Sequence, residues 1–249
     1  MIFQWVLNTT SNLVKLYLSR NLLKGSTSNH FSFAMNLLQY LDLSYNVFKG
    51  EDLKSLCTLH SLYMSENNMT EDLPSILCGL SCGCVRYSLQ ELSLTSNQIM
   101  GSLPDLSVFL SLKTLDLYSN QLSGKILEGI KLPSHLEYLS IGSNFLEGGV
   151  PKSFGSTCTL ELLELFENKL SKDLTVIFSH LSGCSRYSLQ YLYLSTNQIS
   201  DTLPNTISMF PSLKELSLDN NKLNGTISKD LRFPTEHEAL YLMSNSLKV

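Results

Sequence analysis

A spaced pattern of leucines that ends in asparagine recurs along almost the whole chain. Each recurrence approximates L-x-x-L-x-L-x-x-N, as in "LKTLDLYSN" and "LKELSLDNN", and x-L-x-G usually follows. The asparagines are Asn21, Asn46, Asn67, Asn97, Asn120, Asn144, Asn168, Asn197, Asn221 and Asn245. Successive asparagines are 21 to 30 residues apart, a period typical of proteins made of stacked coils. The pattern predicts about ten coils, each packed against its neighbours.

The leucines three and five residues before each asparagine, such as Leu192 and Leu194, predict a short strand with its leucines on one face. A single coil cannot bury this apolar face, so neighbouring coils must stack into a continuous core. We therefore expect an α/β leucine-rich repeat solenoid. It should form a curved right-handed superhelix of about ten repeats, with a parallel β-sheet on its concave side.

The asparagine and the glycine of the pattern have separate structural roles. Each asparagine amide is expected to bond the backbone of adjacent coils, so that the ten side chains form a ladder. A buried polar group left without its partner costs roughly 1–3 kcal/mol. The glycine four residues later permits a tight backbone path on the convex side. Glu71, Lys172 and Asp201 replace this glycine without interrupting the array.

Proline follows the asparagine by seven residues in four coils, at Pro74, Pro104, Pro151 and Pro204. The unit L-x-x-L-x-L-x-x-N-x-L-x-G-x-L/I-P resembles the plant-specific leucine-rich repeat of extracellular receptor-like proteins and receptor kinases. The stretches "KSFGSTCTLELLEL" and "SGCSRYSLQYLYLSTNQI" are similar to the cell-surface group that includes fungal-elicitor receptors. The resemblance covers residues 13–249. It implies a receptor ectodomain that binds a ligand and pairs with co-receptors.

The repeats predict one array over residues 13–249, with both ends uncapped and residues 1–12 as part of a preceding repeat. Residues 68–97 and 169–197 form two long repeats. Residues 57–99, which begin "CTLHSLYMSENNM", align with residues 158–199, which begin "CTLELLELFENKL". We infer that four repeats were duplicated together.

The duplication makes four of the six cysteines interpretable, because Cys57 corresponds to Cys158 and Cys84 to Cys184. In stacked coils these positions are close neighbours, since strands lie about 4.8 Å apart. We predict disulfides Cys57–Cys84 and Cys158–Cys184; the alternative is free thiols, as in a cytosolic array.

The two remaining cysteines, Cys78 and Cys82, have no counterparts in the second copy, and their role stays open. The stretch "CGLSCGC" lacks the histidine or second C-x-x-C of a zinc site.

Three N-x-S/T triplets, at Asn8, Asn68 and Asn224, are candidate glycosylation sites. With paired cysteines they favour a secreted protein, so we expect the parent protein at the extracellular face of the plasma membrane. The sequence shows no signal-peptide pattern and no apolar run of about 18 residues. We expect no membrane contact from this chain itself.

Catalytic and cofactor motifs are absent from the sequence. The five histidines fall at unrelated positions of the repeat, and no P-loop, G-x-S-x-G or H-E-x-x-H motif occurs. The net charge of -4 gives no basic footprint for nucleic acid. We expect a protein that is not an enzyme and that binds no cofactor, metal or nucleic acid.

In each coil, the residues six, four, two and one before the asparagine should face solvent on the concave sheet. In the fifth to eighth coils, large side chains replace small polar ones at these positions. The predicted ligand-binding residues are Tyr118, Tyr138, Leu162, Glu164, Phe166, Tyr191 and Tyr193, bordered by Asp116 and Glu167.

Phe166 is expected beside Tyr193 on the next strand. Gathered surface aromatics mark many binding sites. The alternative is that tyrosines cover the sheet because of their β propensity.

These features predict an extracellular ligand-recognition segment of a plant receptor-like protein in defence or developmental signalling. Its expected partners are a peptide, protein or glycan ligand and the ectodomain of a co-receptor kinase. Two alternatives stay open: a secreted inhibitor of a pathogen enzyme such as a pectinase, and a nonfunctional truncated fragment.

Overall fold

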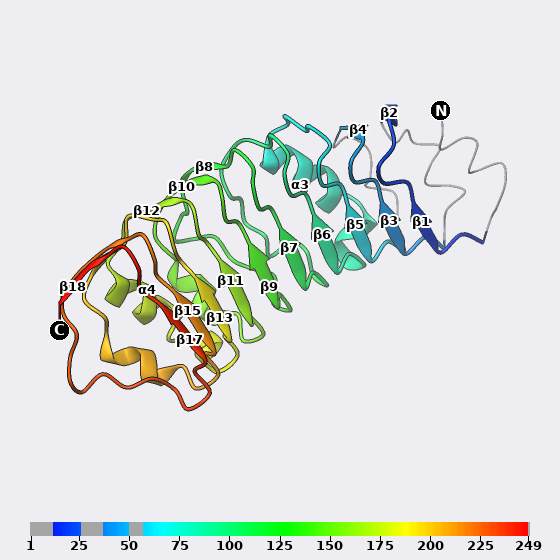
Figure 1. Ribbon diagram of the computed structural model, residues 1–249. Coiled ribbons are helices and arrows are strands. Elements are labelled where there is room, and N and C mark those ends of the chain that lie inside the picture. Colours follow the sequence, from blue (N-terminus) through cyan, green and yellow to red (C-terminus); the bar gives the residue numbers. More distant parts are fainter. Residues whose placement is uncertain (1–11, 26–36, 50–56, 249) are drawn as a thin grey trace.

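The computed structural model describes residues 12–25, 37–49 and 57–248, which form a solenoid of stacked coils (Figure 1). The partial repeat predicted for residues 1–12 lies outside these ranges except for its last residue. In the described part, one three-residue strand per coil joins a ten-stranded parallel sheet in sequence order. The strands are β1 (Lys15–Tyr17), β3 (Tyr40–Asp42), β5 (Ser61–Tyr63), β6 (Glu91–Ser93), β7 (Thr114–Asp116), β9 (Tyr138–Ser140), β11 (Leu162–Glu164), β13 (Tyr191–Tyr193), β15 (Glu215–Ser217) and β17 (Ala239–Tyr241). The predicted fold class is confirmed.

The register of this main sheet places a leucine at the centre of every strand. Leu115 of β7 lies beside Leu139 of β9, which lies beside Leu163 of β11 and then Leu192 of β13. All four are fully buried. Burial of one such side chain contributes about 1.5–3 kcal/mol. The rows therefore build one core that runs along the stack.

The asparagine ladder is present from coil to coil. The amide nitrogen of Asn197 donates to the carbonyl oxygens of Leu194 in its own coil, at 3.1 Å, and of Leu165 in the preceding coil, at 2.9 Å. Its amide oxygen accepts from the backbone N–H of Leu170 at 2.9 Å. Asn46 and Asn245, near the two ends of the described array, bond their preceding coils in the same way.

The residue before each ladder asparagine adopts the left-handed backbone conformation, which the repeat pattern does not predict. Its φ lies between 51° and 57° in all ten coils. The residues are Arg20, Tyr45, Glu66, Ser96, Ser119, Ser143, Glu167, Thr196, Asn220 and Ser244. Side chains other than glycine rarely take this conformation. The asparagine amide also bonds the carbonyl two residues before it, as Asn197 does to Ser195 at 3.2 Å, and so closes a loop around this residue.

Short strands after the asparagine form small parallel sheets on one flank of the solenoid, a second feature absent from the prediction. They are β2 (Lys24–Gly25), β4 (Val47–Phe48), β8 (Ser123–Lys125), β10 (Phe145–Gly148), β12 (Lys169–Leu170), β14 (Ser200–Asp201), β16 (Lys222–Thr226) and β18 (Ser246–Lys248). The predicted glycine turn is left-handed at Gly101, Gly124, Gly148 and Gly225, and Asp201 takes the same turn with φ 93°.

Helices occupy the side of the coils away from the main sheet (Figure 1). The long repeats contain α3 (Leu73–Ser81) and α4 (Leu174–Leu181). Four 3₁₀ helices also occur in the described residues: η1 (Cys84–Tyr87), η2 (Lys152–Ser156), η3 (Cys184–Tyr187) and η4 (Asn205–Met209). Asp72 caps α3 by accepting from the backbone N–H of Ser75 at 3.2 Å. Phe178 of α4 packs edge-on against Phe210, with ring centroids 5.1 Å apart.

Both predicted disulfides are present in the structure. Cys57–Cys84 and Cys158–Cys184 each join Cα atoms 4.8 Å apart, across 27 and 26 residues of sequence. Cys78 and Cys82 are free and exposed on α3 and just beyond its end, with their Sγ atoms 3.4 Å apart. The bridges therefore tie the two duplicated long repeats to the coils before them.

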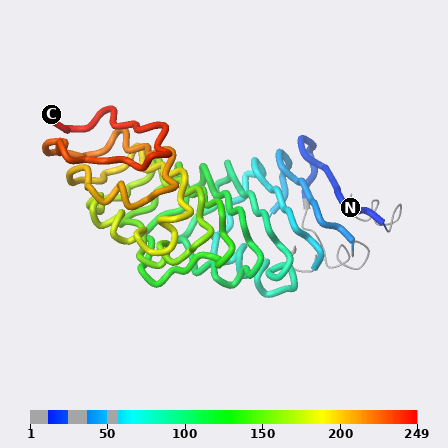
Figure 2. Tube along the Cα trace, turned by 90° about the horizontal axis from the view of Figure 1, so that it is seen from below, coloured from blue at the N-terminus to red at the C-terminus, as the bar shows by residue number. Residues whose placement is uncertain are grey.

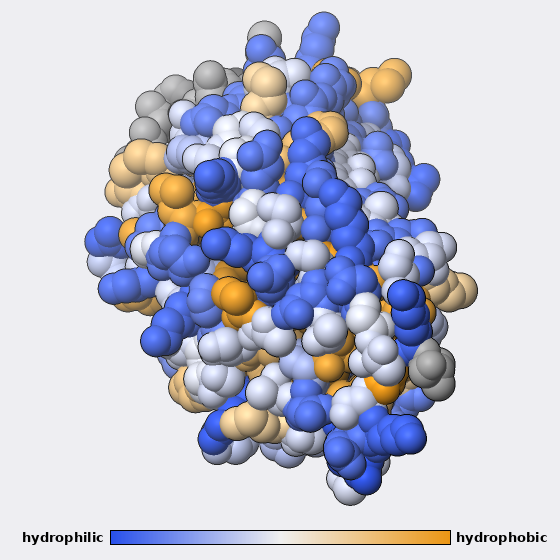
Figure 3. Space-filling model, turned by 90° about the vertical axis from the view of Figure 1, so that its left-hand side faces the viewer, coloured by the Kyte–Doolittle hydropathy of each residue, from blue (hydrophilic) through white to orange (hydrophobic). Residues whose placement is uncertain are grey.

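The coils follow one another along a curved path, which is clearest in Figure 2. At the C-terminal end, Leu240, Leu242 and Leu247 are half-buried, whereas their counterparts in the central coils are fully buried. Figure 3 looks at this end and shows hydrophobic residues reaching the surface among hydrophilic ones. The core of each coil is thus covered by the next coil in the stack.

Replacement of Asn197 by leucine should lower the free energy of unfolding by roughly 1–3 kcal/mol, because the buried N–H of Leu170 loses its acceptor and the carbonyls of Leu165, Leu194 and Ser195 each lose one donor. Urea denaturation followed by circular dichroism measures this change. Asn205→Leu, at an exposed position of η4, is the matched control and should leave the midpoint nearly unchanged. An unchanged midpoint for Asn197→Leu would show that the ladder does not stabilise the stack.

Removal of one bridge by the double substitution Cys158→Ser and Cys184→Ser should destabilise the chain by roughly 3 kcal/mol, because the unfolded chain regains the freedom of a closed loop. Thermal unfolding of the oxidised protein measures the loss. The control is Cys78→Ser with Cys82→Ser, which removes two thiols but no bridge. Equal melting temperatures for the two double variants would contradict a stabilising role for the disulfide.

Candidate ligand-binding site

The predicted ligand-binding residues lie on four adjacent coils of the main sheet. Six residues before the asparagine, the register forms the row Thr114, Tyr138, Leu162 and Tyr191. Four residues before it, the row is Asp116, Ser140, Glu164 and Tyr193. All of these side chains are half-buried except Ser140, which is 1% exposed. The strands therefore bring the predicted residues together as one surface.

Tyrosine hydroxyls on this surface are bound to glutamates of the next strand. Tyr138 donates to Glu164 at 3.1 Å, and Tyr193 donates to Glu215 at 2.9 Å. Tyr63, nearer the N-terminus, donates to Glu91 in the same way. Each pair links two coils diagonally, so the rings are held in place.

The same environment shifts the titration of these tyrosines. Burial first, and the neighbouring glutamate second, raise the pKa of Tyr63, Tyr138 and Tyr193 well above the usual tyrosine range. The hydroxyls consequently stay protonated and remain donors to the carboxylates.

Phe166 contacts Tyr118 two coils away, and its expected adjacency to Tyr193 stays a prediction. The ring centroids of Phe166 and Tyr118 are 5.6 Å apart, whereas Tyr193 lies opposite Glu164 in the register. Gly142, between them, leaves room for the ring: a Cβ atom there would lie 2.9 Å from Cε1 of Phe166. Tyr118, Gly142 and Phe166 each lie two residues before a ladder asparagine. This shared position is the sequence signal from which the contact could have been predicted.

A second row of tyrosines, which sequence reasoning missed, lies on the same sheet nearer the N-terminus. The ring centroids of Tyr17 and Tyr40 are 4.7 Å apart, and those of Tyr40 and Tyr63 are 5.2 Å apart. These residues occupy the same outward positions as Tyr138 and Tyr193. The aromatic surface of the sheet therefore extends beyond the predicted cluster.

The charges on the outward positions are strongly one-sided. From the second coil onward, these positions carry no lysine or arginine; their charged residues are Asp42, Glu66, Glu91, Asp116, Glu164, Glu167, Glu215 and Asp219. Burial raises the pKa of the Asp116 carboxyl, and Glu164 adds to this effect. The backbone N–H of Tyr118, which donates to Oδ1 of Asp116 at 3.1 Å, opposes it. The net direction is upward.

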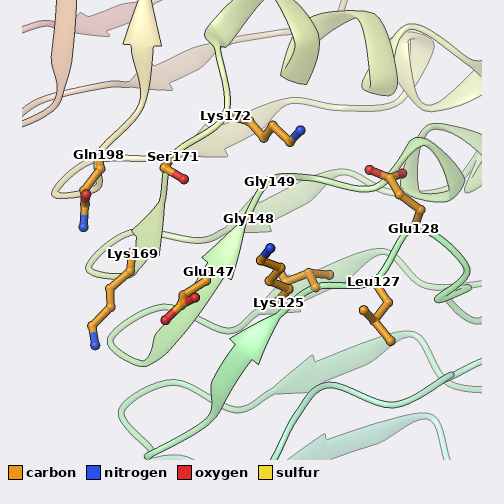
Figure 4. Close-up of a pocket in the computed structure, with 11 residues that line it drawn as sticks. Lys125, Leu127, Glu128, Glu147, Gly148, Gly149, Lys169, Ser171, Lys172 and Gln198 are labelled. Carbon is orange, nitrogen blue, oxygen red and sulfur yellow. The ribbon is translucent and has the colours of Figure 1, made fainter.

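A separate hollow of about 670 Å³ lies on the flank beside β8, β10 and β12 (Figure 4). Its charged lining residues are Lys125, Glu128, Glu147, Lys169 and Lys172. The stem of Lys172 crosses Gly149 so closely that a Cβ atom there would lie 2.3 Å from it. No predicted ligand-binding residue lines this hollow, so the two surfaces provide independent sites for mutation.

Other predicted site residues are scattered. Asn8 lies outside the described residues. Asn68 is exposed and its side-chain oxygen accepts from Gln98, while Asn224 is exposed on β16. Within the described ranges, no three histidine, cysteine or acidic side chains are grouped to hold a metal. In the same ranges, no helix is both long and apolar enough to span a membrane.

A family model described as Leucine Rich Repeat matches residues 58–80, 88–109, 111–132, 135–157, 188–210 and 212–233. A second model of the same description matches residues 34–57. Together they cover more than half of the chain. The chain belongs to the leucine-rich repeat family.

This leucine-rich repeat chain is also homologous to plant receptor-like proteins. Receptor-like protein 35 of Arabidopsis thaliana is 34% identical over 260 residues, an alignment that covers 98% of this chain and 25% of the relative. The chain thus spans about a quarter of the length of that relative.

Solved receptor ectodomains share the fold. The plant peptide hormone receptor RGFR1, solved in complex with RGF2, superposes with a TM-score of 0.74 at 26% identity, over 95% of this chain and 40% of that one. The Arabidopsis receptor kinase HAESA, solved with the peptide hormone IDA and the co-receptor SERK1, gives 0.70 at 25% identity, over 95% and 38%.

Replacement of Asp116 by asparagine should stabilise this leucine-rich repeat chain at neutral pH. The pKa of Asp116 is raised on folding, so the folded state binds its proton more tightly and stability falls as pH rises through that pKa. The asparagine variant has no carboxyl at this position to ionise, so it avoids this loss of stability. Its higher melting temperature should vanish below about pH 4, where the carboxyl of the unaltered chain is protonated in both the folded and the unfolded state. Melting temperatures of both proteins between acid and neutral pH test this; a constant difference would contradict it.

Proposed function

We propose that this chain is the extracellular ligand-recognition segment of a plant receptor-like protein and that it binds a peptide or protein on its concave sheet. The observation that supports this most directly is the cluster on β7, β9, β11 and β13. There, ring contacts and tyrosine–glutamate bonds hold aromatic side chains in fixed positions. Rigid, half-buried aromatics are the side chains that contribute most to protein interfaces.

The structural neighbours support the class of ligand. RGFR1 was solved with RGF2, and HAESA with the peptide hormone IDA and the co-receptor SERK1. By analogy, the parent protein is proposed to lie at the plasma membrane and to act in defence or developmental signalling together with a co-receptor kinase. The chain contributes recognition, and no chemical step is assigned to it.

Selection of short random peptides on the immobilised chain tests the proposal, because it requires no ligand to be chosen beforehand. Peptides enriched on the unaltered chain should bind at least tenfold more weakly to the double variant Phe166→Ala and Tyr193→Ala, a loss of about 1.4 kcal/mol or more. The affinities are measured by isothermal titration or surface plasmon resonance.

The matched control is Tyr187→Ala, which removes an exposed tyrosine from η3, outside the main sheet. Its affinity should equal that of the unaltered chain. Circular dichroism verifies that all variants are folded. Enriched peptides that bind the double variant as tightly as the unaltered chain would place recognition elsewhere.

A further inference from the structure

The outward positions of the concave sheet carry mostly negative charge. From the second coil onward its outward positions hold only acidic charged residues, and its two basic ones, Lys15 and Arg20, both belong to the first coil. The chain as a whole carries 18 basic and 22 acidic residues, so this separation is a property of the face. Surfaces with one sign of charge favour partners of the other sign.

Three residues at the centre of this face lie side by side in the register. Asp116 of β7 is opposite Ser140 of β9, and Ser140 is opposite Glu164 of β11. Strand spacing places the backbones of the two acidic residues roughly 10 Å apart, a span that two side chains can close around one organic cation. Ser140 forms the floor between them.

The Ser140 hydroxyl is buried without a hydrogen bond. The residue is 1% exposed, and its Oγ has no partner at hydrogen-bonding geometry among the described residues. It lies near Asp116 and Tyr138 and partly offsets the upward shift in the pKa of each. Buried hydroxyls are almost always paired, so the floor of the site has unused hydrogen-bonding capacity.

The two carboxylates have incomplete sets of partners as well. Asp116 accepts the backbone N–H of Tyr118 through Oδ1, and Glu164 accepts the Tyr138 hydroxyl through Oε2. Both donors are neutral, and each bond uses only one oxygen of its carboxylate. A carboxylate has room for further donors, and charged donors give the strongest hydrogen bonds.

We propose that a lysine or arginine side chain of the peptide ligand binds between Asp116 and Glu164, above the Ser140 hydroxyl. The cationic group donates to both carboxylates, and the hydroxyl then donates to Asp116 as the two acidic side chains close over it. Leu162, beside Tyr138 and Tyr191 in the neighbouring row, lies where the aliphatic stem of the basic residue would pack. This assignment rests on the proposed function and adds the chemical identity of the anchoring residue.

The experiment uses the peptides selected on the unaltered chain. Each lysine or arginine of a selected peptide is replaced in turn by norleucine, which keeps the aliphatic stem and removes the charge. At one position the replacement should weaken binding at least tenfold, and the effect should shrink as salt screens the charges.

A double-mutant cycle assigns the effect to the site. On the variant Asp116→Asn with Glu164→Gln, the basic peptide and its norleucine counterpart should bind almost equally. The matched control is Glu128→Gln with Glu147→Gln, which removes two carboxylates from the flanking hollow of Figure 4 and should preserve the tenfold difference. Circular dichroism verifies that both double variants are folded, since Glu164 also accepts the Tyr138 hydroxyl.

Ser140→Ala tests the floor as a positioning residue. Removal of an unpaired buried hydroxyl should leave the melting temperature equal or higher, while the ratio of affinities for the basic and norleucine peptides falls several-fold. A change in packing alone would weaken both peptides alike and leave this ratio constant, which would remove Ser140 from the site.

The remaining outcomes separate the two proposals. Selected peptides without a basic anchor, or an anchor whose effect survives in Asp116→Asn with Glu164→Gln, would overturn the basic-residue site. The proposed function would then still stand if binding is lost in Phe166→Ala with Tyr193→Ala. Failure of the unaltered chain to enrich any peptide would overturn the proposed function and, with it, the site.

Discussion

The asparagine side chain is the interaction on which the rest of the solenoid depends. Its nitrogen donates to carbonyls of its own and the preceding coil, and its oxygen accepts a backbone N–H, as in Asn168 with Leu165, Ile141 and Leu146. A three-residue strand cannot supply these bonds once the chain turns, and unpaired polar groups in an apolar core are costly. The ladder therefore allows each chain turn to lie inside the core, and it holds the left-handed residue that directs the turn.

Most of the fold could be predicted because the stacking is one-dimensional. Each strand of the main sheet pairs only with the strands of the neighbouring coils, so aligning asparagines in the sequence also aligns strands in space; the same alignment placed Cys158 next to Cys184. The flanking strands could not be predicted this way. They depend on how closely backbones such as Phe145–Gly148 and Ser123–Lys125 approach after the turn, which the spacing of the asparagines does not specify.

The sequence predicted which residues of the candidate site lie in the same row of the main sheet, but it did not predict which side chains contact one another. The alignment placed Asp116, Glu164 and Tyr193 in one row, and the register has them so. The contact between Phe166 and Tyr118 was missed because it depends on the glycine between them. Gly142 has no side chain to separate the two rings. Likewise, a serine expected as an ordinary polar covering is buried without a partner at Ser140.

The spacing of the main sheet constrains any chain that lies across it. Neighbouring strands are about 4.8 Å apart, whereas an extended peptide advances about 3.3 Å per residue. A peptide that crosses the coils therefore returns to the same alignment only about every third residue, over every second coil. Equivalent contacts between such a ligand and the sheet therefore recur with a period of about three residues. The ligand side chains between these contacts meet the gaps between strands.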